Sequence, residues 1–325
     1  MTDILFAIMA SILGPVATFL FYILLNFIVN RFPEKIQRVL RPYVFIGPVL
    51  LLVGVLLVGP TIQTMTFAFM NEDSSEWVGF KNFIKLFTDP QFLITVRNNF
   101  EWIAVVPAVT VILGLFIATL TDKLGPIRER VFKSIIFMPM AISFVAASSI
   151  WRLTYSWSAG KTQIGMLNAI VELFGGKAIP WIQNEDFSIN NLLLMVVVIW
   201  ANAGFAMTLL SAAIKAVPEE TVEAASIDGA NAFQAFFQVV VPQIWGTAVS
   251  VFITVLISTM KIFDVVWGMT GGDFHTNVLG VDFFRQYFVY NNTGKASAVV
   301  VVLMIAIIPI MIYQVRTYRK QEELR

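Results

Sequence analysis

Residues 214–246 read IKAVPEETVEAASIDGANAFQAFFQVVVPQIWG, an acidic, helix-prone segment between two long stretches without charge. Pro218 suits the first helical position, because its missing N–H costs nothing there. Glu219 and Glu220 then fall in the first turn, where the helix dipole favours negative charge. Gly229 can end this helix in a left-handed conformation, and a second amphipathic stretch follows it. The pattern predicts a helix, a turn and a second helix lying along a membrane surface.

The composition of the chain is that of a membrane protein. Of its 325 residues, 58% are hydrophobic and only 13% are charged, whereas soluble domains carry about a quarter charged residues. The net charge of +1 argues against a nucleic-acid partner. The chain has no cysteine, which excludes disulfides and thiolate metal sites. Its single histidine, His275, is too little for a zinc cluster or a Ser-His-Asp triad.

Seven stretches without Asp, Glu, Lys or Arg are candidates for membrane-spanning helices. A span needs about 20 mostly apolar residues, and seven runs reach or approach that length: 4–30, 42–71, 102–121, 134–151, 187–214, 229–260 and 296–315. The first part of the sixth run belongs to the acidic segment, which leaves a helix near 241–260. The fourth run is the shortest and contains Pro139. We therefore expect an all-α polytopic membrane protein with seven transmembrane helices.

Basic residues in the connections predict the orientation, because Lys and Arg favour the cytoplasmic side. With the N-terminus outside, the inner segments carry thirteen basic residues, against nine in the longer outer segments. The inner segments are then 31–41, 122–133, 215–228 and 316–325, and the outer segments are 72–101, 152–186 and 261–295. We expect the N-terminus outside and the C-terminus in the cytoplasm.

The first run is best interpreted as an extra helix before a core of six. It lacks the basic leader of a signal peptide and is longer than the usual apolar core of one. Residues 1–41 would then be an extra transmembrane helix with a basic cytoplasmic linker. Residues 42–315 would be the six-helix core, with a cytoplasmic coupling loop at 215–240, and 316–325 a basic cytoplasmic tail.

The cytoplasmic loop resembles a known signature. Residues 223–225 are Glu-Ala-Ala, Gly229 follows six residues after the glutamate, and Pro242 ends the segment. This combination resembles the Glu-Ala-Ala signature of the permease subunits of ABC importers, which reads E-A-A, three residues, G, then nine residues to an Ile-x-Leu-Pro ending. The chain has Val239 and Val241 where Ile and Leu are usual, which is a conservative departure.

In that family the loop is a coupling helix that seats in a groove of a separate ATPase subunit. A rigid helix transmits rigid-body motion, small residues let it sit deeply, and a glycine turn sets its angle. An acidic helix suits a partner with a basic rim. The resemblance makes Glu223 the polar anchor and Gly229 the conformational one. The full set of expected coupling residues is Glu219, Glu220, Glu223, Ala224, Ala225, Asp228, Gly229 and Pro242.

The C-terminal third resembles the permeases of carbohydrate ABC importers. It contains KIFDVVWGMTGGDFHTNVLGVDFFRQYF (261–288) and then GKASAVVVVL (294–303). The stretch WVGFKNFIKLFTDPQF (77–92) is similar to their first outer loop, and FKSIIFMPMAISFVAASSIWR (132–152) resembles the α-glucoside branch. The resemblance runs from about residue 43 to 315. It implies the type I ABC importer permease fold, with the extra N-terminal helix outside the shared core.

This resemblance also implies partners and a substrate class. A second, similar permease chain, an ATPase dimer and an extracytoplasmic sugar-binding protein would work with this chain in a bacterial or archaeal cytoplasmic membrane. The substrate would be an oligosaccharide, an α-glucoside or a related solute. The chain itself would be no enzyme and would bind no cofactor or metal, because ATP and Mg belong to the ATPase. No G-x-x-x-x-G-K-[ST] phosphate loop occurs, since FGGKA (174–178) and NTGKA (292–296) fail the spacing.

Uncharged sugars need hydroxyl and amide partners along their pathway. The candidates inside the expected spans are Asn202, Thr208, Ser211, Ser250, Thr254 and Ser258. The last three recur every four residues, so they fall close to one face of a helix. Close helix packing is the favoured alternative, because small and hydroxylated residues are common at helix contacts in membranes. Asn202 is the better pathway candidate, because a buried amide in lipid needs a partner.

Lys261 and Asp264 lie three residues apart near the expected outer membrane edge. They would form an ion pair at a helix end or take part in an outer gate, and the ion pair is the preferred interpretation.

A secondary transporter or channel is the main rival class. Proton- or sodium-coupled carriers usually place ionisable residues within their spans, and the seven runs contain none. A membrane enzyme would need paired carboxylates, a metal cluster or an activated nucleophile. Glu219, Glu220 and Glu223 are crowded on one helix without a histidine or metal-type spacing, so the enzyme class is disfavoured.

Overall fold

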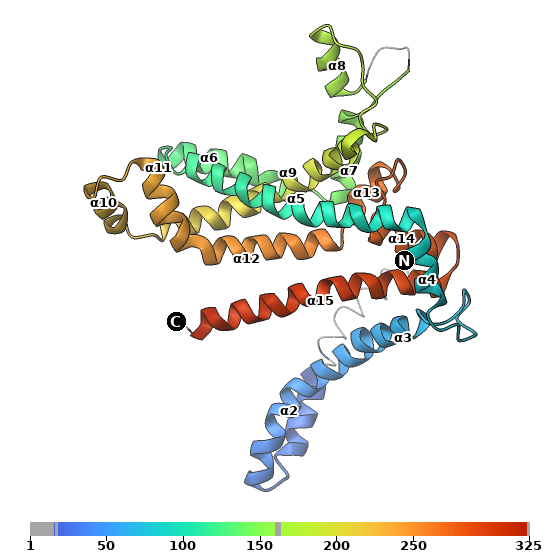
Figure 1. Cartoon of the computed structure of the whole chain (residues 1–325). Helices are drawn as coiled ribbons and strands as arrows, with labels where there is room; N and C mark the ends of the chain where they lie inside the picture. The colour runs from blue at the N-terminus through green and yellow to red at the C-terminus, as the bar shows by residue number, and fades with distance from the viewer. Residues whose placement is uncertain (1–15, 17–18, 160–163, 324–325) are drawn as a thin grey trace, which may run out of the picture. The chain divides into compact units, whose positions relative to one another are not determined.

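The computed structural model of the chain describes residues 16, 19–159 and 164–323 (Figure 1). Within these residues the structure is helical, and the only strand-like pairing is an isolated bridge between Met70 and Trp77. Internal contacts divide the chain into two units, Met1–Thr66 and Phe67–Arg325. The all-α class predicted from the sequence is confirmed.

The first unit contains a short apolar helix, Phe19–Val29, and all but the last residue of a long apolar helical segment, Glu34–Phe67. The long segment consists of α2 (Glu34–Val53), a π-turn (Gly54–Val58) and α3 (Gly59–Phe67). The Tyr22 hydroxyl donates to the Phe45 carbonyl at 2.9 Å, and their rings stack, so the short helix lies against α2. The expected domain boundary after residue 41 falls inside the continuous helix α2 and stays a prediction.

The second unit contains the remaining elements. In chain order they are α4 (Lys81–Thr88), α5 (Pro90–Thr121), α6 (Pro126–Phe137), a 3₁₀ turn (Met138–Ala141), α7 (Phe144–Thr154), α8 (Met166–Leu173), a 3₁₀ turn (Asp186–Ser188), α9 (Ile189–Lys215), α10 (Glu219–Ile227), α11 (Ala232–Ala235), a π-turn (Phe236–Val240), α12 (Val241–Met260), α13 (Asp264–Met269), α14 (Leu279–Phe284), a π-turn (Arg285–Val289) and α15 (Thr293–Glu323).

The core of this second unit forms around α9, which packs against α5 and α12. Trp102, Leu194, Val198 and Val265 are fully buried members of its main apolar cluster. Gly114 of α5 allows a close approach to α9, because a Cβ there would lie 2.6 Å from the Cβ of Ala206 and 2.9 Å from backbone atoms of α9. Small residues let membrane helices approach until their backbones touch, which is what these positions provide.

The span expected at 134–151 is broken. The helix direction bends by 102° between the segments Pro126–Ala141 and Phe144–Thr154. Pro139 lies in the 3₁₀ turn at the break, and Ser143 caps α7 by accepting a hydrogen bond from the Ala146 N–H at 3.3 Å. Proline cannot supply the backbone donor that a continuous helix needs, so the bend has a local cause.

The predicted count of seven spans is not confirmed. The described residues contain five helices that are long and apolar enough to cross a membrane, or six if the bent pair is one span. The bend at 134–151 accounts for one difference. The first predicted run, 4–30, lies mostly outside the described residues, and the helix Phe19–Val29 at its end is too short to cross by itself. The predicted helix near 241–260 corresponds to α12.

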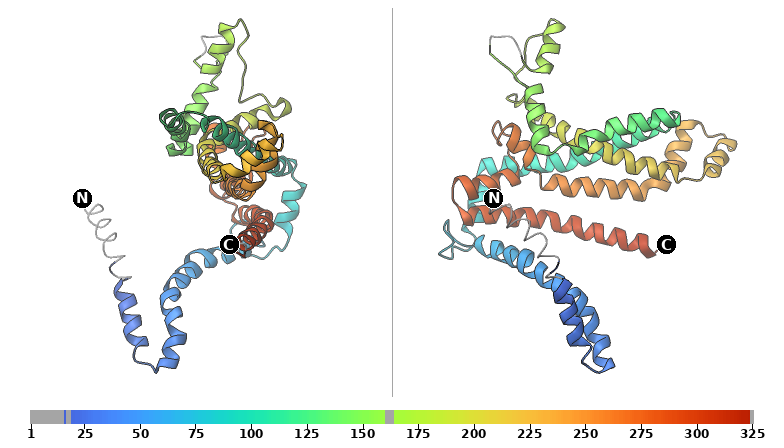
Figure 2. Two further views of the ribbon diagram at one scale, coloured as in Figure 1. Left: turned by 90° about the vertical axis from the view of Figure 1, so that its left-hand side faces the viewer. Right: turned by 180° about the vertical axis from the view of Figure 1, so that it is seen from behind.

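The connections of the second unit are sorted between two ends. Figure 1 shows α10 and α11 at one end of the α5, α9 and α12 layer and α13 and α14 at the other, and the view from behind agrees (Figure 2). We call these the α10 end and the α14 end. Buried asparagines hold the α14 end together: Asn98 donates to the carbonyls of His275 at 2.6 Å and Asn277 at 2.9 Å, and Asn190 donates to the Phe274 carbonyl at 2.7 Å.

The tight helix contact gives a first prediction. Gly114→Ala should lower the stability of the detergent-purified protein by about 1–3 kcal/mol, because the added methyl group overpacks the contact with α9. Thermal unfolding of the purified chain measures this loss. Gly54→Ala is the matched control, since Gly54 is helical and has no atom within 4 Å of its would-be Cβ. Equal effects of the two substitutions would contradict the prediction.

Candidate functional site

The acidic segment of the sequence forms a helix, a turn and a second helix at the α10 end. Helix α10 begins at Glu219, and Pro218 precedes it in an extended conformation (φ −61°, ψ 130°). Proline therefore sits one position before the first helical residue, instead of occupying it as predicted. Glu219 and Glu220 lie in the first turn, as expected. The carboxylates are thus placed where the helix dipole favours negative charge.

Gly229 ends α10 in the left-handed conformation predicted from the sequence, with φ of +91°. The Ala230 N–H donates to the Ala225 carbonyl at 2.9 Å, and the Gly229 N–H donates to the Ser226 carbonyl at 3.1 Å. These two bonds satisfy two of the free carbonyls of the last turn, as in the Schellman ending of helices. A Cβ at Gly229 would meet no atom within 4 Å, so backbone conformation alone requires glycine here.

The second helix of the segment is fixed by its own cap. The Asn231 side chain accepts from the Gln234 N–H at 2.9 Å, and the Gln234 side chain accepts from the Asn231 N–H at 2.9 Å. This reciprocal capping box defines where α11 starts. A π-turn continues into α12, and Pro242 lies in the first turn of α12, where a missing N–H is tolerated. The conformation of the turn between α10 and α11 is therefore fixed by Gly229 on one side and by the capping box of Asn231 on the other.

The surface of α10 is exposed and acidic. Glu219, Glu220, Glu223, Ala224 and Asp228 are exposed, whereas Ala225 is half-buried. Their carboxylates form no ion pair within the described part of the chain. Two large apolar side chains are also uncovered at this end: Ile227 is 86% exposed and Phe233 is 71% exposed. A rigid helix with uncovered carboxylates and an uncovered isoleucine can dock into a groove that is basic at its rim and apolar inside.

Most of the candidate pathway residues bond within their own helices. Asn202 donates to the Val198 carbonyl and Thr208 to the Gly204 carbonyl, both at 2.8 Å. On α12, the hydroxyls of Ser250, Thr254 and Ser258 donate to carbonyls three or four residues earlier. Thr208, Thr254 and Ser258 are exposed, and Asn202 and Ser250 are half-buried. Each hydroxyl oxygen keeps acceptor capacity, so a role in a solute pathway stays a prediction for these five residues.

Ser211 has different surroundings, because it belongs to a cluster of charged side chains. Its hydroxyl donates to Asp122 Oδ1 at 2.7 Å and accepts a hydrogen bond from the Lys133 ammonium. Lys133 Nζ also lies 2.6 Å from Asp122 Oδ1 and 2.6 Å from Glu129 Oε1. We call Asp122, Glu129, Lys133, Ser211 and Lys215 the inner charge cluster. In the sequence, Lys133 and Lys215 served only to predict the orientation of the chain in the membrane.

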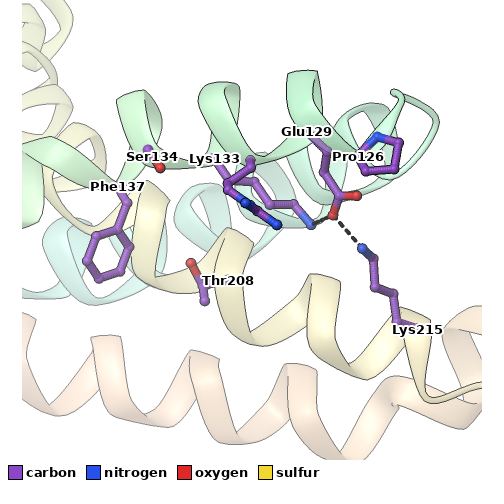
Figure 3. A pocket seen from close by; sticks show the side chains of 8 residues that line it. Pro126, Glu129, Lys133, Ser134, Phe137, Thr208 and Lys215 are labelled. Atoms are coloured by element: carbon purple, nitrogen blue, oxygen red, sulfur yellow. Dashed lines mark hydrogen bonds and ion pairs between the residues drawn. The ribbon is translucent and has the colours of Figure 1, made fainter.

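The inner charge cluster borders a cavity of about 540 Å³ between α6 and α9. Figure 3 shows the Glu129 side chain between the ammonium groups of Lys133 and Lys215, with Phe137 and Thr208 further along the cavity. One sequence signal was available for part of this arrangement: Glu129 and Lys133 have the i, i+4 spacing that brings opposite charges together on a helix. The contacts with Asp122, Ser211 and Lys215 join different helices and depend on tertiary structure.

Lys261 and Asp264 both lie in the described part of the chain, and the expected ion pair between them is not formed. Both side chains are exposed, and Asp264 begins α13, where it stands in the first turn. Its backbone carbonyl accepts a 3.5 Å hydrogen bond from the Ser148 hydroxyl of α7. Lys261 follows the end of α12, so the change of helix separates the two charges. A gating role for the two residues remains a prediction.

A polar cavity of about 430 Å³ at the α14 end was also missed from the sequence. Its lining includes Asp89, Asp282, Arg285 and Lys295. Lys295 Nζ lies 3.6 Å from Asp89 Oδ2, and the Gln286 amide donates to Asp282 Oδ1 at 3.4 Å. Burial raises the pKa of the Asp282 carboxyl above its usual range. No group of three or more side chains suited to a metal ion occurs among the described residues.

A family model of known proteins matches this chain. Residues 110–321 match the family described as binding-protein-dependent transport system inner membrane component. The match begins in the second half of α5, runs through α6 to α14 and ends near the end of α15, and it therefore includes both ends of the second unit. The chain belongs to this family of multi-pass membrane permeases of ABC importers.

Proteins with similar sequences are also transport permeases. The osmoprotective compounds uptake permease protein GgtC of Synechocystis is 42% identical over 282 residues, covering 86% of this chain and 100% of the relative. The α-glucoside transport system permease protein AglF of Rhizobium meliloti is 42% identical over 289 residues, covering 88% and 85%. A crystal structure of a bacterial alginate ABC transporter, in complex with an alginate pentasaccharide-bound periplasmic protein, contains a chain that matches with a TM-score of 0.74 at 19% identity, covering 86% of this chain and 94% of that one. The type I ABC permease fold is confirmed.

The buried carboxyl at the α14 end gives a pH-dependent prediction. A carboxyl whose pKa is raised by folding binds its proton more tightly in the folded state. Its contribution to stability is therefore present below the unfolded pKa of about 4 and is lost as the pH rises through the folded pKa. Asp282→Asn keeps an oxygen acceptor for Gln286 and removes this loss. The variant should unfold at a higher temperature than the original protein at pH 7, and the difference should shrink below about pH 4.

Thermal unfolding of the purified protein across this pH range tests the sign of the effect. Asp186→Asn, at an exposed position, reports the effect of the same substitution where the carboxyl remains in water. An Asp282→Asn variant that unfolds below the original protein at pH 7 would show that the charged form is the stabilising one.

Proposed function

We propose that this chain is the transmembrane permease subunit of an ATP-driven importer that receives its solute from a binding protein. The proposed substrate is an α-glucoside, an oligosaccharide or a related osmoprotective solute. Two relatives at 42% identity, aligned over 86% and 88% of the chain, carry osmoprotective compounds and α-glucosides by name. An uncharged solute also fits the candidate pathway residues, which offer hydroxyl and amide groups without charge.

The proposed connection to ATP is the exposed helix α10. Glu223 would anchor it to a basic position on a separate ATPase, while Ala224 and Ala225 allow close approach and Gly229 sets its angle to α11. Glu219, Glu220, Asp228 and Pro242 would complete the coupling surface. The observation that carries this proposal is the combination of an exposed acidic α10, a left-handed Gly229 and an uncovered Ile227 in a chain of this family.

The proposed assembly pairs this chain with a second, similar permease. An ATPase dimer would hold ATP and Mg at the α10 end, and a sugar-binding protein would dock at the α14 end. The α10 end would then face the cytoplasm, with the N-terminus outside and the C-terminus inside the cell. Closure of the ATPase dimer would draw the two coupling helices together and open the solute cavity toward the binding protein.

The assignment of segments follows the same proposal. Residues 1–41 would supply the extra helix and its linker, 42–315 the permease core with the coupling loop at 215–240, and 316–325 the cytoplasmic tail. On the core, Asn202, Thr208, Ser250, Thr254 and Ser258 are the proposed contacts of the solute. Lys261 and Asp264 are proposed as part of an outer gate.

Substituting the left-handed glycine should weaken coupling. An L-residue in this conformation costs roughly 1–2 kcal/mol, so Gly229→Ala should reduce ATP-dependent sugar uptake by about tenfold, at 1.4 kcal/mol per factor of ten. The amount of chain in the membrane should stay the same. Uptake of a labelled α-glucoside by vesicles or cells measures the change. Gly125→Ala is the matched control, because Gly125 is equally open but has a φ of −63°; a similar loss there would remove the conformational explanation.

Co-purification tests the proposed function itself. The tagged chain is purified gently from its native membrane, and the bound proteins and their ATP hydrolysis are measured. An ATPase that binds the original chain and is lost from a Glu223→Ala/Gly229→Ala double variant supports the proposal. A chain that purifies alone and still takes up sugar without ATP would be a secondary transporter or channel, and the proposal would be wrong.

A further inference from the structure

The inner charge cluster joins three helices directly beside the start of α10. Asp122 follows the last residue of α5, Glu129 and Lys133 lie on α6, and Ser211 and Lys215 lie in the last turns of α9. Lys215 is the last residue of α9, and α10 begins at Glu219 after a short connection. One of the two chain connections of α10 therefore starts from a residue of this cluster, and the other leads through Gly229 to α11.

The contacts of the cluster cross between helices in two places. Lys133 of α6 binds Asp122 at 2.6 Å and the hydroxyl of Ser211, which itself donates to Asp122 at 2.7 Å. Lys215 of α9 donates a hydrogen bond to Glu129 of α6 and has Asp122 as a second carboxylate at 3.9 Å. The α6 helix is thus tied to α5 by Lys133 and to α9 by Glu129.

Burial determines how much each ion pair of the cluster contributes to stability. The side chains of Asp122, Glu129 and Lys133 are 14%, 17% and 21% exposed, whereas that of Lys215 is 52% exposed. Removing one partner of a mostly buried pair leaves a charge without compensation, which is strongly unfavourable. Partly exposed pairs contribute less. The cluster therefore resists separation at Lys133 and is more easily altered, without unfolding the chain, at Lys215.

A second contact holds the same two helices together further along. Gly204 of α9 faces the end of α6, where a Cβ would lie 2.6 Å from the Ile136 carbonyl oxygen and 2.6 Å from Phe137 Cα. Backbone contact at Gly204 and ion pairs at Lys215 fix α6 to α9 at two separated points. Two such points prevent one helix from pivoting on the other, as a single contact would allow.

We propose that Asp122, Glu129, Lys133 and Lys215 are positioning residues that make α6 and α9 move as one body with the coupling helix. Displacement of α10 then reaches the bent pair of α6 and α7 as well as α9. At the far side of the bend, α7 contacts α13 through Ser148 and Gly268, where a Cβ on the glycine would lie 2.8 Å from Ser148 Cβ. This inference rests on the proposed function, because it concerns how ATP hydrolysis at the α10 end is coupled to transport.

The simpler interpretation of the cluster is local support of α6. Glu129 and Lys133 alone would stabilise one helix through their i, i+4 contact. That interpretation needs neither Asp122 nor Lys215, which come from other helices. The two interpretations make different predictions for Lys215, whose removal leaves the pair on α6 intact.

The test measures how many ATP molecules are hydrolysed for each sugar transported. The full importer, with its ATPase and binding protein, is reconstituted with the original chain, Lys215→Gln or Glu129→Gln. Lys215→Gln should raise this ratio about tenfold, within the usual range of coupling effects between sites, while the chain and bound ATPase remain at normal levels. Lys215→Arg, which keeps the charge, should restore the original ratio.

Arg128→Gln is the matched control, because Arg128 lies on α6, is exposed, and makes no ion pair in the described part of the chain. The inference is overturned if Lys215→Gln keeps the original ratio, or if Arg128→Gln raises it equally. A double variant with both Lys215→Gln and Glu129→Gln should be no worse than the worse single variant, because both substitutions remove the same ion pair between Glu129 and Lys215. Purely additive losses would also overturn the inference.

Failure of the proposed function gives a different result. If the reconstituted original chain takes up sugar without ATP, no coupling ratio exists, and both proposals are wrong. If the original chain consumes ATP during uptake and Lys215→Gln is unchanged, only the positioning role of the cluster is wrong.

Discussion

The close approach of α5 and α6 to α9 is the constraint on which the second unit depends. Lipid tails are as apolar as the side chains between helices, so membrane helices are held by tight packing and polar contacts more than by apolar burial. Gly114 and Gly204 provide that packing within one turn of α9, where α5 meets Ala206 and α6 meets Gly204. Once the backbones touch there, the polar residues at both ends of the helices are brought within hydrogen-bond distance.

The two ends of the helices use different chemistry for this purpose. At the α14 end, buried amides such as Asn98 and Asn190 donate to loop carbonyls and hold the connections in place. At the α10 end, the inner charge cluster joins the helices, and the segment beyond it stays uncovered, with Ile227 86% exposed. The amide contacts suit a surface at the α14 end that keeps its shape. The charge cluster fixes the start of the α10 segment, while the exposed helix beyond it remains accessible to another protein.

The candidate pathway residues show how the membrane limits what polar groups can do. A hydroxyl without a partner in a lipid-exposed helix is costly, and Thr208, Thr254 and Ser258 avoid this cost by donating to their own helices. Their side chains remain exposed on the isolated chain.

The sequence by itself determined the helical class, the helix-turn-helix around Gly229 and the family of the chain. These features depend on composition and on neighbouring residues: apolar runs, acidic residues in a first turn, and a glycine whose backbone angle excludes other residues. Tertiary structure decided how many runs cross the membrane without a break, because Pro139 and the cap at Ser143 bend a run that looked continuous. It also joined the Glu129 and Lys133 pair of α6 to Asp122 and Lys215, because these charges follow or lie on other helices and meet only in the folded chain.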